Sequence, residues 1–336
     1  MPASDKVYSG LSMLPMGKAA DTIYEGCLVL EGGAFRGLYT SGFLDALMEA
    51  GINLQTVIGT SAGALNGMYY MARQIGQTAR INLEYRHDKR YVGRKALLKN
   101  RGIMGFDFAL NEAADVPLDE KAFNDPRRRF VAVVTNCLTG EAEYHERGNT
   151  PDIIKSVQAS ATMPLLSLPV YIGGVPYLDG GIGCKIAYQW ALDQGYKKII
   201  VLKTREAGFL KNEMGTPEIR AIEKVYRRYP AFAEAFISSD RRYNEQTEEI
   251  LRLDRRGVLM QFSPQTPVGI GRLEGDMEVL GDLYYQGYHE GRRAVPKILE
   301  YLGDPIDFSA AENPLPENAF VGSACIRPDI AAPEAA

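Results

Sequence analysis

The stretch VIGTSAGALNG, residues 57–67, joins an apolar run to a segment of good helix formers. Within it, Gly59-Thr60-Ser61-Ala62-Gly63 fits the pattern G-x-S-x-G. In that pattern a serine stands at a sharp turn between a strand and a helix, where its hydroxyl is exposed. The preceding run INLQTVI predicts the strand, and ALNGMYYMARQIG predicts the helix. Ser61 is therefore a candidate nucleophile, and Gly59 and Gly63 are the glycines of the turn.

The same order of strand, tight turn and helix occurs once more directly upstream. Residues 26–30, GCLVL, form a continuous apolar run typical of a strand buried on both faces. The glycine-rich EGGAFRG, residues 31–37, follows, and apolar residues at near-helical spacing continue up to Gly51. Two such units predict parallel strands with right-handed crossovers, and they place both glycine-rich turns at the carboxyl edge of the sheet. We therefore predict an α/β fold with a mostly parallel sheet.

Further along the chain, strand and helix patterns alternate before the sequence becomes mostly helical. RRFVAVVTNC with AEYHE predicts one strand pair, and VYIGGVPYLDGG predicts another with Gly173-Gly174 as its turn. KIAYQWALDQGY followed by KKIIVLKT predicts one more helix and strand. From about residue 215 the pattern is helical, apart from the strand-like VLMQFSP, and a long helix is expected near 277–302.

The overall composition excludes several classes of function. The 336-residue chain has a net charge of −4, which provides no broad cationic surface for a nucleic acid, so we expect no nucleic-acid partner. Asp, Glu and His show no clustered ligand spacing, so neither a metal nor another cofactor is expected. No run approaches the roughly 20 apolar residues that span a bilayer, so any membrane contact would be peripheral.

The N-terminus and the cysteines bear on where the protein resides. The apolar stretch 11–16 is short and is interrupted by Pro15, which argues against a signal peptide. The four cysteines contain no C-x-x-C pair, and we expect reduced thiols. Both features predict a cytoplasmic protein.

The glycine-rich segment EGGAFRG allows two functions. Its backbone N–H groups stand at the start of a helix and can cradle a phosphate or form an oxyanion hole. An exposed serine on the neighbouring strand favours the oxyanion hole, because a nucleotide cradle has no use for it. A dinucleotide site also expects an acidic residue near the end of the second strand, which here ends in Ile58-Gly59-Thr60-Ser61. A non-catalytic anion-binding or nucleotide-binding domain is the alternative left open.

The base that would activate Ser61 is not decided by the residues alone. His87 and His145 stand in charged segments typical of the surface. His289 is the histidine that follows a candidate acid, in the Ser-Asp-His order of conventional esterases. Asp179 in YLDGG stands at the end of a predicted strand and can act as a base itself, although D-G-G is also typical of a simple turn.

Four motifs in a fixed order resemble those of the patatin-like phospholipases, lipid acyl hydrolases with a serine–aspartate dyad. They are EGGAFRG at 31–37, GTSAG at 59–63, ASATMP at 159–164 and DGG at 179–181. The resemblance covers about residues 26–205 and implies a three-layer α/β fold with Ser61 as nucleophile and Asp179 as base. It implies cleavage of fatty-acyl esters through an acyl-enzyme, without a metal or cofactor. The implied oxyanion loop comprises Gly32, Gly33, Ala34, Arg36 and Gly37.

The loop departs from the family at one position, because Ala34 stands where a third glycine is typical. The N–H group is kept, but the freedom to adopt positive φ is lost. If the loop requires a left-handed residue there, the oxyanion hole would be strained and the activity weakened.

The resemblance and the composition together suggest a division of the chain. We expect an N-terminal extension at 1–25, a catalytic domain at 26–215, a helical region packed on it at 216–325, and a disordered tail at 326–336. Within the helical region, 219–237 mixes aromatic with basic residues and would suit contact with anionic lipid. An ordinary amphipathic helix buried on one side is the alternative for this stretch.

Overall fold

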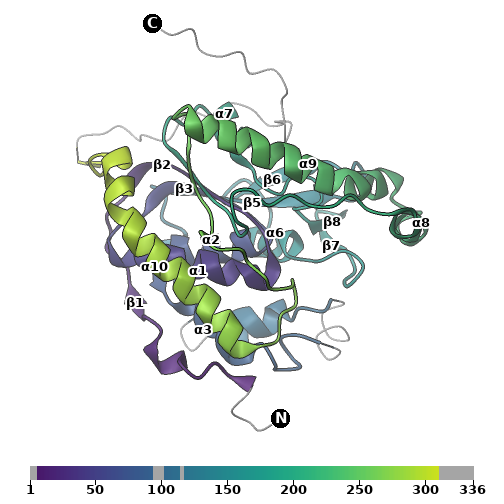
Figure 1. Ribbon diagram of the computed structural model, residues 1–336, viewed down its shortest axis with the longest axis horizontal. Helices are drawn as coiled ribbons and strands as arrows, with labels where there is room; N and C mark the ends of the chain where they lie inside the picture. The colour runs from purple at the N-terminus through teal and green to yellow at the C-terminus, as the bar shows by residue number, and fades with distance from the viewer. Residues whose placement is uncertain (1–5, 94–101, 114–116, 310–336) are drawn as a thin grey trace, which may run out of the picture.

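The two strand–turn–helix units predicted from the sequence form the centre of the molecule. The computed structural model describes residues 6–93, 102–113 and 117–309 (Figure 1). β2 (Tyr24–Leu30) and β3 (Leu54–Thr60) pair in parallel, and each continues through a glycine-rich turn into a helix. These helices are α1 (Gly37–Glu49) and α2 (Ala62–Met71).

The central sheet has eight strands in the described residues. Their order is β10-β9-β2-β3-β5-β8-β7, with β6 paired to β5. The strands from β10 to β5 run parallel, whereas β6, β8 and β7 pair antiparallel. Both predicted strand pairs are present, and the mostly parallel sheet is confirmed. The remaining strands are β5 (Arg129–Asn136), β6 (Ala142–Glu146), β7 (Val170–Ile172), β8 (Val175–Asp179), β9 (Ile199–Leu202) and β10 (Met260–Phe262).

Helices cover both faces of this sheet. They are α3 (Gln77–Tyr85), α5 (Glu120–Phe123), α6 (Ile153–Ser160), α7 (Tyr188–Asp193), α8 (Thr216–Val225), α9 (Pro230–Arg255) and α10 (Met277–Leu302). Shorter elements are η2 (Leu11–Met13), η3 (Ala34–Arg36) and η4 (Phe108–Glu112), together with a separate strand pair, β1 (Gly17–Lys18) with β4 (Gln74–Ile75).

Alternate side chains of β2 enter different cores. Leu28 and Leu30 pack in a cluster with residues of α1, α2 and α10, whereas Cys27 and Val29 pack with residues of α7 and α9. This follows from the two-residue period of a strand, whose successive side chains point to opposite faces. Figure 1 shows α1 and α10 along one face of the sheet and α9 along the other. The fold is therefore a three-layer α/β sandwich with a helical C-terminal region, as predicted.

The C-terminal region matches the expected helices in outline and differs at one break. The long helix expected near 277–302 is α10. The helical pattern after residue 215 is divided into α8 and α9, because Pro230 lacks a backbone N–H and begins a new helix at its first turn. No helix of the described residues is long and apolar enough to cross a membrane. The tail predicted at 326–336 lies outside the described residues, and the domain boundaries stay predictions.

The cysteines follow the expectation only in part. Cys27 and Cys137 are buried free thiols, as expected. Cys184 is disulfide-bonded, which corrects the expectation of a reduced thiol for that residue. Cys325 lies outside the described residues.

Candidate active site

Ser61 stands at the tip of the turn between β3 and α2. Its backbone has φ 56° and ψ −122°, which an ordinary residue seldom adopts. A Cβ at Gly59 would lie 2.4 Å from the carbonyl oxygen of Gly63, and a Cβ at Gly63 would lie 2.4 Å from that of Leu30. Both distances are too short for a side chain, so the two glycines are what allow the tight turn.

Asp179 ends β8, two strands along from β3 in the same sheet, and reaches the same point. Because β8 pairs with β5 and β5 pairs with β3, the end of β8 lies close to the end of β3. Ser61 Oγ donates a hydrogen bond of 2.7 Å to Asp179 Oδ2. The other carboxylate oxygen, Oδ1, accepts the N–H of Gly181 at 2.8 Å. The structure thus brings together the serine and the aspartate, and Gly181 fixes the carboxylate in an orientation suited to accept the serine proton.

The environment of Asp179 favours its protonated form. Burial raises the pKa of Asp179 above its ordinary value, against the opposing effects of the hydrogen bonds from Ser61 and Gly181 and the charges of Arg272 and Lys185. A carboxyl group with a raised pKa is a better general base near neutral pH than an ordinary aspartate.

The histidines lie elsewhere. A ring nitrogen of His87 bonds the carbonyl oxygen of Gly275, and Nδ1 of His145 bonds Ser156 Oγ. His289 is on α10, where its ring contacts tyrosine rings of the same helix. None of the three lines the two cavities described below that contain Ser61. The structure therefore offers no histidine as the base of a Ser-Asp-His triad at Ser61.

The predicted oxyanion loop folds over Ser61. A Cβ at Gly32 would lie 2.9 Å from Ser61 Cβ, and a Cβ at Gly37 would lie 2.9 Å from Ala62 Cβ. Both glycines therefore allow the loop to contact the turn that carries Ser61, the nucleophile elbow. The N–H groups of Gly33 and Ala34 donate no hydrogen bond to the residues that the structure describes. Free N–H groups beside a nucleophile are suited to bind an oxyanion.

Two residues that hold this arrangement were not singled out from the sequence. Ser160 Oγ accepts the backbone N–H of Ser61 at 2.8 Å, and Ser160 belongs to the quoted motif ASATMP. Thr204 follows β9, and its hydroxyl donates to the carbonyl oxygen of Gly32 at 3.0 Å. The motif ASATMP could have pointed to Ser160 as a site residue. The sequence around Thr204 contains no motif that could have done the same.

Comparison with known proteins agrees with this geometry. Residues 28–186 match the family model described as patatin-like phospholipase. The chain carries a patatin-like domain. A second model, described as a domain of unknown function (DUF6363), matches residues 229–303.

Several curated proteins are similar to part of this chain. The uncharacterized protein YjjU of Escherichia coli K12 is 27% identical over 187 residues, which are 53% of this chain and 51% of YjjU. The lysophospholipase nte1 of Aspergillus terreus is 30% identical over 164 residues, 46% of this chain and 10% of that protein. The crystal structure of VipD from Legionella pneumophila aligns with 88% of this chain and 72% of its own, at 14% identity and a TM-score of 0.44. The chain thus spans about half of YjjU and a tenth of nte1.

Ala34 of the patatin-like domain has the left-handed conformation that its loop position suggested. Its φ is 50°, in the region that costs a non-glycine residue about 1 kcal/mol or more. The departure from the family's third glycine is therefore accompanied by backbone strain in the loop.

We expect Ala34→Gly to relieve this strain. Glycine adopts the conformation freely, so the free energy of unfolding should rise by up to about 1 kcal/mol. Ala221→Gly on the exposed side of α8 is the matched control, and it should lose about 1 kcal/mol because glycine disfavours helix. Urea denaturation of both variants measures the difference. A loss of stability in Ala34→Gly as large as in the control would contradict a strained loop.

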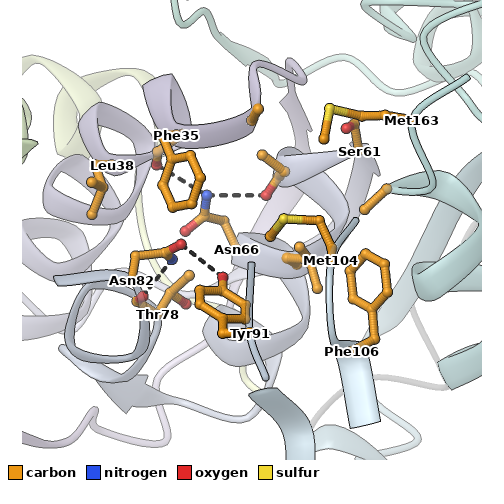
Figure 2. Close-up of a pocket in the computed structure, with 15 residues that line it drawn as sticks. Phe35, Leu38, Ser61, Asn66, Thr78, Asn82, Tyr91, Met104, Phe106 and Met163 are labelled. Atoms are coloured by element: carbon orange, nitrogen blue, oxygen red, sulfur yellow. Dashed lines mark hydrogen bonds between the residues drawn. The ribbon is translucent and has the colours of Figure 1, made fainter. Parts of the chain in front are cut away.

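A narrow apolar cavity opens on one side of Ser61 (Figure 2). Ser61 and Met163 lie at one end of it, and a hydrogen-bonded group of Thr78, Asn82 and Tyr91 lies at the other. Apolar side chains between them include Phe35, Leu38, Leu65, Met104 and Phe106. The lining is apolar, but the volume is about 40 Å³, which holds a small apolar group beside Ser61 and not a whole acyl chain.

A second cavity of about 630 Å³ opens on the other side of the dyad. It is lined by both Ser61 and Asp179, by the oxyanion loop and by segments beyond the patatin-like domain. Arg36, the basic residue of the loop, lines it and is 7% exposed. Burial, together with the charges of Arg205 and Arg272, lowers the pKa of Arg36 to about 10, against the opposing charge of Glu31, so the side chain is still a cation at neutral pH.

The aromatic and basic stretch at 219–237 does not form an aromatic surface. Tyr226 and Phe232 are buried, and their rings pack with that of Phe236 in a small core against β8. Arg227 and Arg228 are exposed. The amphipathic helix buried on one side is therefore the better description, because the aromatic side chains gain more from the core than they would from solvent.

Proposed function

We propose that this protein hydrolyses fatty-acyl ester bonds of lipids through a Ser61–Asp179 dyad. The observation that carries the proposal is the 2.7 Å hydrogen bond from Ser61 Oγ to Asp179 Oδ2, beside a loop with unpaired N–H groups. The patatin-like domain and its lysophospholipase relatives support a lipid as the substrate. The apolar lining of the narrow cavity supports an acyl group on this side of Ser61, and a whole acyl chain requires the cavity to widen from its volume of about 40 Å³.

The reaction would proceed in two halves. As Ser61 Oγ attacks the ester carbonyl carbon, Asp179 takes the hydroxyl proton, and the N–H groups of Gly33 and Ala34 bind the oxyanion. Collapse of the tetrahedral intermediate breaks the ester C–O bond, and Asp179 returns the proton to the leaving alcohol. In the second half Asp179 takes a proton from water as the water oxygen attacks the acyl carbonyl carbon. Collapse of this second tetrahedral intermediate breaks the bond to Ser61 Oγ, Asp179 returns the proton to that oxygen, and the fatty acid leaves.

A lipid surface could reach this site through an exposed apolar rim. Leu165 and Leu166 line the larger cavity and are 52% and 40% exposed, and Leu168 in the same loop is 59% exposed. This rim, rather than the stretch at 219–237, is the surface that we propose for peripheral membrane contact. A cytoplasmic location stays a prediction.

The proposal is tested by covalent labelling. A fluorophosphonate probe reacts with activated serines, and mass spectrometry of the labelled peptides should place the adduct on Ser61 alone. Ser61→Ala should abolish labelling, whereas Ser9→Ala, at an exposed serine near the N-terminus, should leave it unchanged. Absence of an adduct on Ser61 in the folded protein would favour the non-catalytic anion-binding alternative.

A further inference from the structure

We infer that the larger cavity beside the dyad binds the phosphate of an anionic lipid headgroup, and that Lys211 and Arg272 are its specificity-determining contacts. The inference rests on the proposed function, since the headgroup belongs to the alcohol that the dyad releases. It assigns a role to chain outside the patatin-like domain, because Lys211 follows that domain and Arg272 lies within the region of unknown function at 229–303.

Beside five carboxylates, the cavity is lined by five cationic side chains. They are Arg36, Lys185, Arg205, Lys211 and Arg272. Lys211 Nζ and Lys185 Nζ lie 3.0 Å and 3.5 Å from the same oxygen, Asp240 Oδ1. Lys211 and Lys185 therefore share one carboxylate, and burial lowers the pKa of both lysines, that of Lys185 well below its ordinary value.

Two arginines of the cavity have no such partner. The side chains of Arg36 and Arg272 make no hydrogen bond or ion pair with the residues that the structure describes, and Nε of Arg36 is buried without a partner. A buried cation without a partner is unfavourable, and an anion that enters the cavity would relieve it. Arg272 is exposed, so its guanidinium is free to turn toward such a ligand.

Three of the five carboxylates that line the cavity lie among the five cations, and the charge of one of them, Glu31, acts on Arg36 and Lys211. Glu31 accepts the backbone N–H of Thr204, Asp179 belongs to the dyad, and Asp240 is shared by the two lysines. The other two, Glu213 and Glu218, are exposed, and Glu218 accepts the N–H of Gly215. The part of the cavity nearest the dyad is therefore the cationic part.

The position of the cations fits the geometry of a phospholipid rather than an unrelated anion. Arg272 and Lys185 are close enough for their charges to act on Asp179. With the ester at Ser61 and the acyl group toward the apolar cavity, the alcohol extends into the larger cavity, where a phosphate on it meets Lys211 and Arg272. A cavity of about 630 Å³ has room for such a headgroup.

The test compares substrates that share one acyl chain and differ in headgroup. Lysophosphatidylglycerol carries a net negative charge, lysophosphatidylcholine is zwitterionic, and monoacylglycerol has no phosphate. In micelles of a non-ionic detergent, wild-type protein should show the highest kcat/KM for lysophosphatidylglycerol and the lowest for monoacylglycerol. Lys211→Gln and Arg272→Gln should each reduce the ratio of these two values about tenfold, since each removes a charge-assisted contact to the phosphate.

Arg228→Gln is the matched control, because Arg228 is exposed and does not line this cavity. It should leave the ratio unchanged. An adduct on Ser61 shows that the dyad is intact in each variant, and thermal denaturation shows that the fold is intact. Arg272 is exposed, so its replacement should not disturb the core.

The outcomes separate this inference from the proposed function. Two results would overturn the headgroup site without contradicting the proposed hydrolase activity, provided that Ser61 is labelled. One is equal kcat/KM for all three esters, and the other is an unchanged ratio of kcat/KM for lysophosphatidylglycerol to that for monoacylglycerol in both variants. Loss of labelling in wild-type protein would overturn both. Inorganic phosphate that inhibits hydrolysis in wild type but not in Arg272→Gln supports the site if the headgroup preference is also present. The same inhibition without that preference would indicate a site for free phosphate and overturn the inference.

Discussion

Asp179→Asn should lower kcat/KM for any ester substrate by about a thousandfold or more, while the protein stays folded. The asparagine has the shape of the aspartate and can keep contacts to Ser61 and Gly181, but it cannot accept a proton, so the nucleophile loses its base. Steady-state hydrolysis of a short-chain ester measures the loss. His289→Ala is the control, since His289 is an exposed residue of α10 that lines neither cavity, and its turnover should equal that of wild type.

The stability of the same variant should depend on pH in a definite direction. The folded-state pKa of Asp179 is raised, so the folded state binds a proton more tightly than the unfolded state does. The contribution of this group to stability is therefore fully present below the ordinary aspartate pKa of about 4 and is lost as the pH rises through the folded value. Asp179→Asn should thus be more stable than wild type at neutral pH, and this advantage should disappear in acid.

Two results would contradict this account of Asp179. Near-normal turnover in Asp179→Asn would show that another group activates Ser61. A large loss of turnover in His289→Ala, with the fold intact, would instead favour the Ser-Asp-His alternative. Urea denaturation at neutral and acid pH measures the difference in free energy of unfolding between Asp179→Asn and wild type. If Asp179→Asn gains more stability over wild type in acid than at neutral pH, the charged carboxylate is not disfavoured in the folded protein.

The parts of the site that the sequence predicts are those encoded by local backbone needs. Gly59 and Gly63 are recognisable because only glycine allows the backbone contacts of the turn at Ser61. The apolar run before them predicts a strand. The strands of the central sheet up to residue 205 and the helices α1, α2 and α7 were predicted for the same reason, because each has its own period and its own turn residues. The helices α3, α5 and α6 were not predicted. Even the long helix α10 was visible in the sequence alone.

The parts that could not be predicted depend on contacts between distant segments. Thr204 hydrogen-bonds to Gly32 of the oxyanion loop because β9 lies beside β2. No local sequence pattern reveals that the two strands are neighbours. Lys211 and Arg272 are ordinary surface-type residues in sequence, and they become notable only when the fold places them around one cavity. The aromatic residues at 219–237 allowed two interpretations for a related reason. The periodicity of an amphipathic helix does not distinguish an apolar face that contacts lipid from one that packs in a core.

The C-terminal helix is also held by contacts that no local pattern shows. α10 lies along α1 (Figure 1), the helix that begins directly after the oxyanion loop. Tyr39 on α1 donates its hydroxyl to Glu290 on α10 at 2.8 Å. A Cβ at Gly287 would lie 2.0 Å from the carbonyl oxygen of Tyr39. The two helix backbones are therefore in direct contact at Gly287, which leaves no room for a side chain.

Gly287→Ala should for this reason destabilise the protein, although alanine is the better helix former. The gain in helix propensity is about 1 kcal/mol, whereas separating two packed helices should cost more, so we expect a net loss of about 2 kcal/mol in the free energy of unfolding. Gly208→Ala is the matched control, because an added Cβ there meets no atom within 4 Å. Thermal and urea denaturation compare the two variants. Equal stability of Gly287→Ala and wild type would mean that α10 is not packed this closely on α1. It would also contradict the inference that α10 stabilises α1, the helix that follows the oxyanion loop.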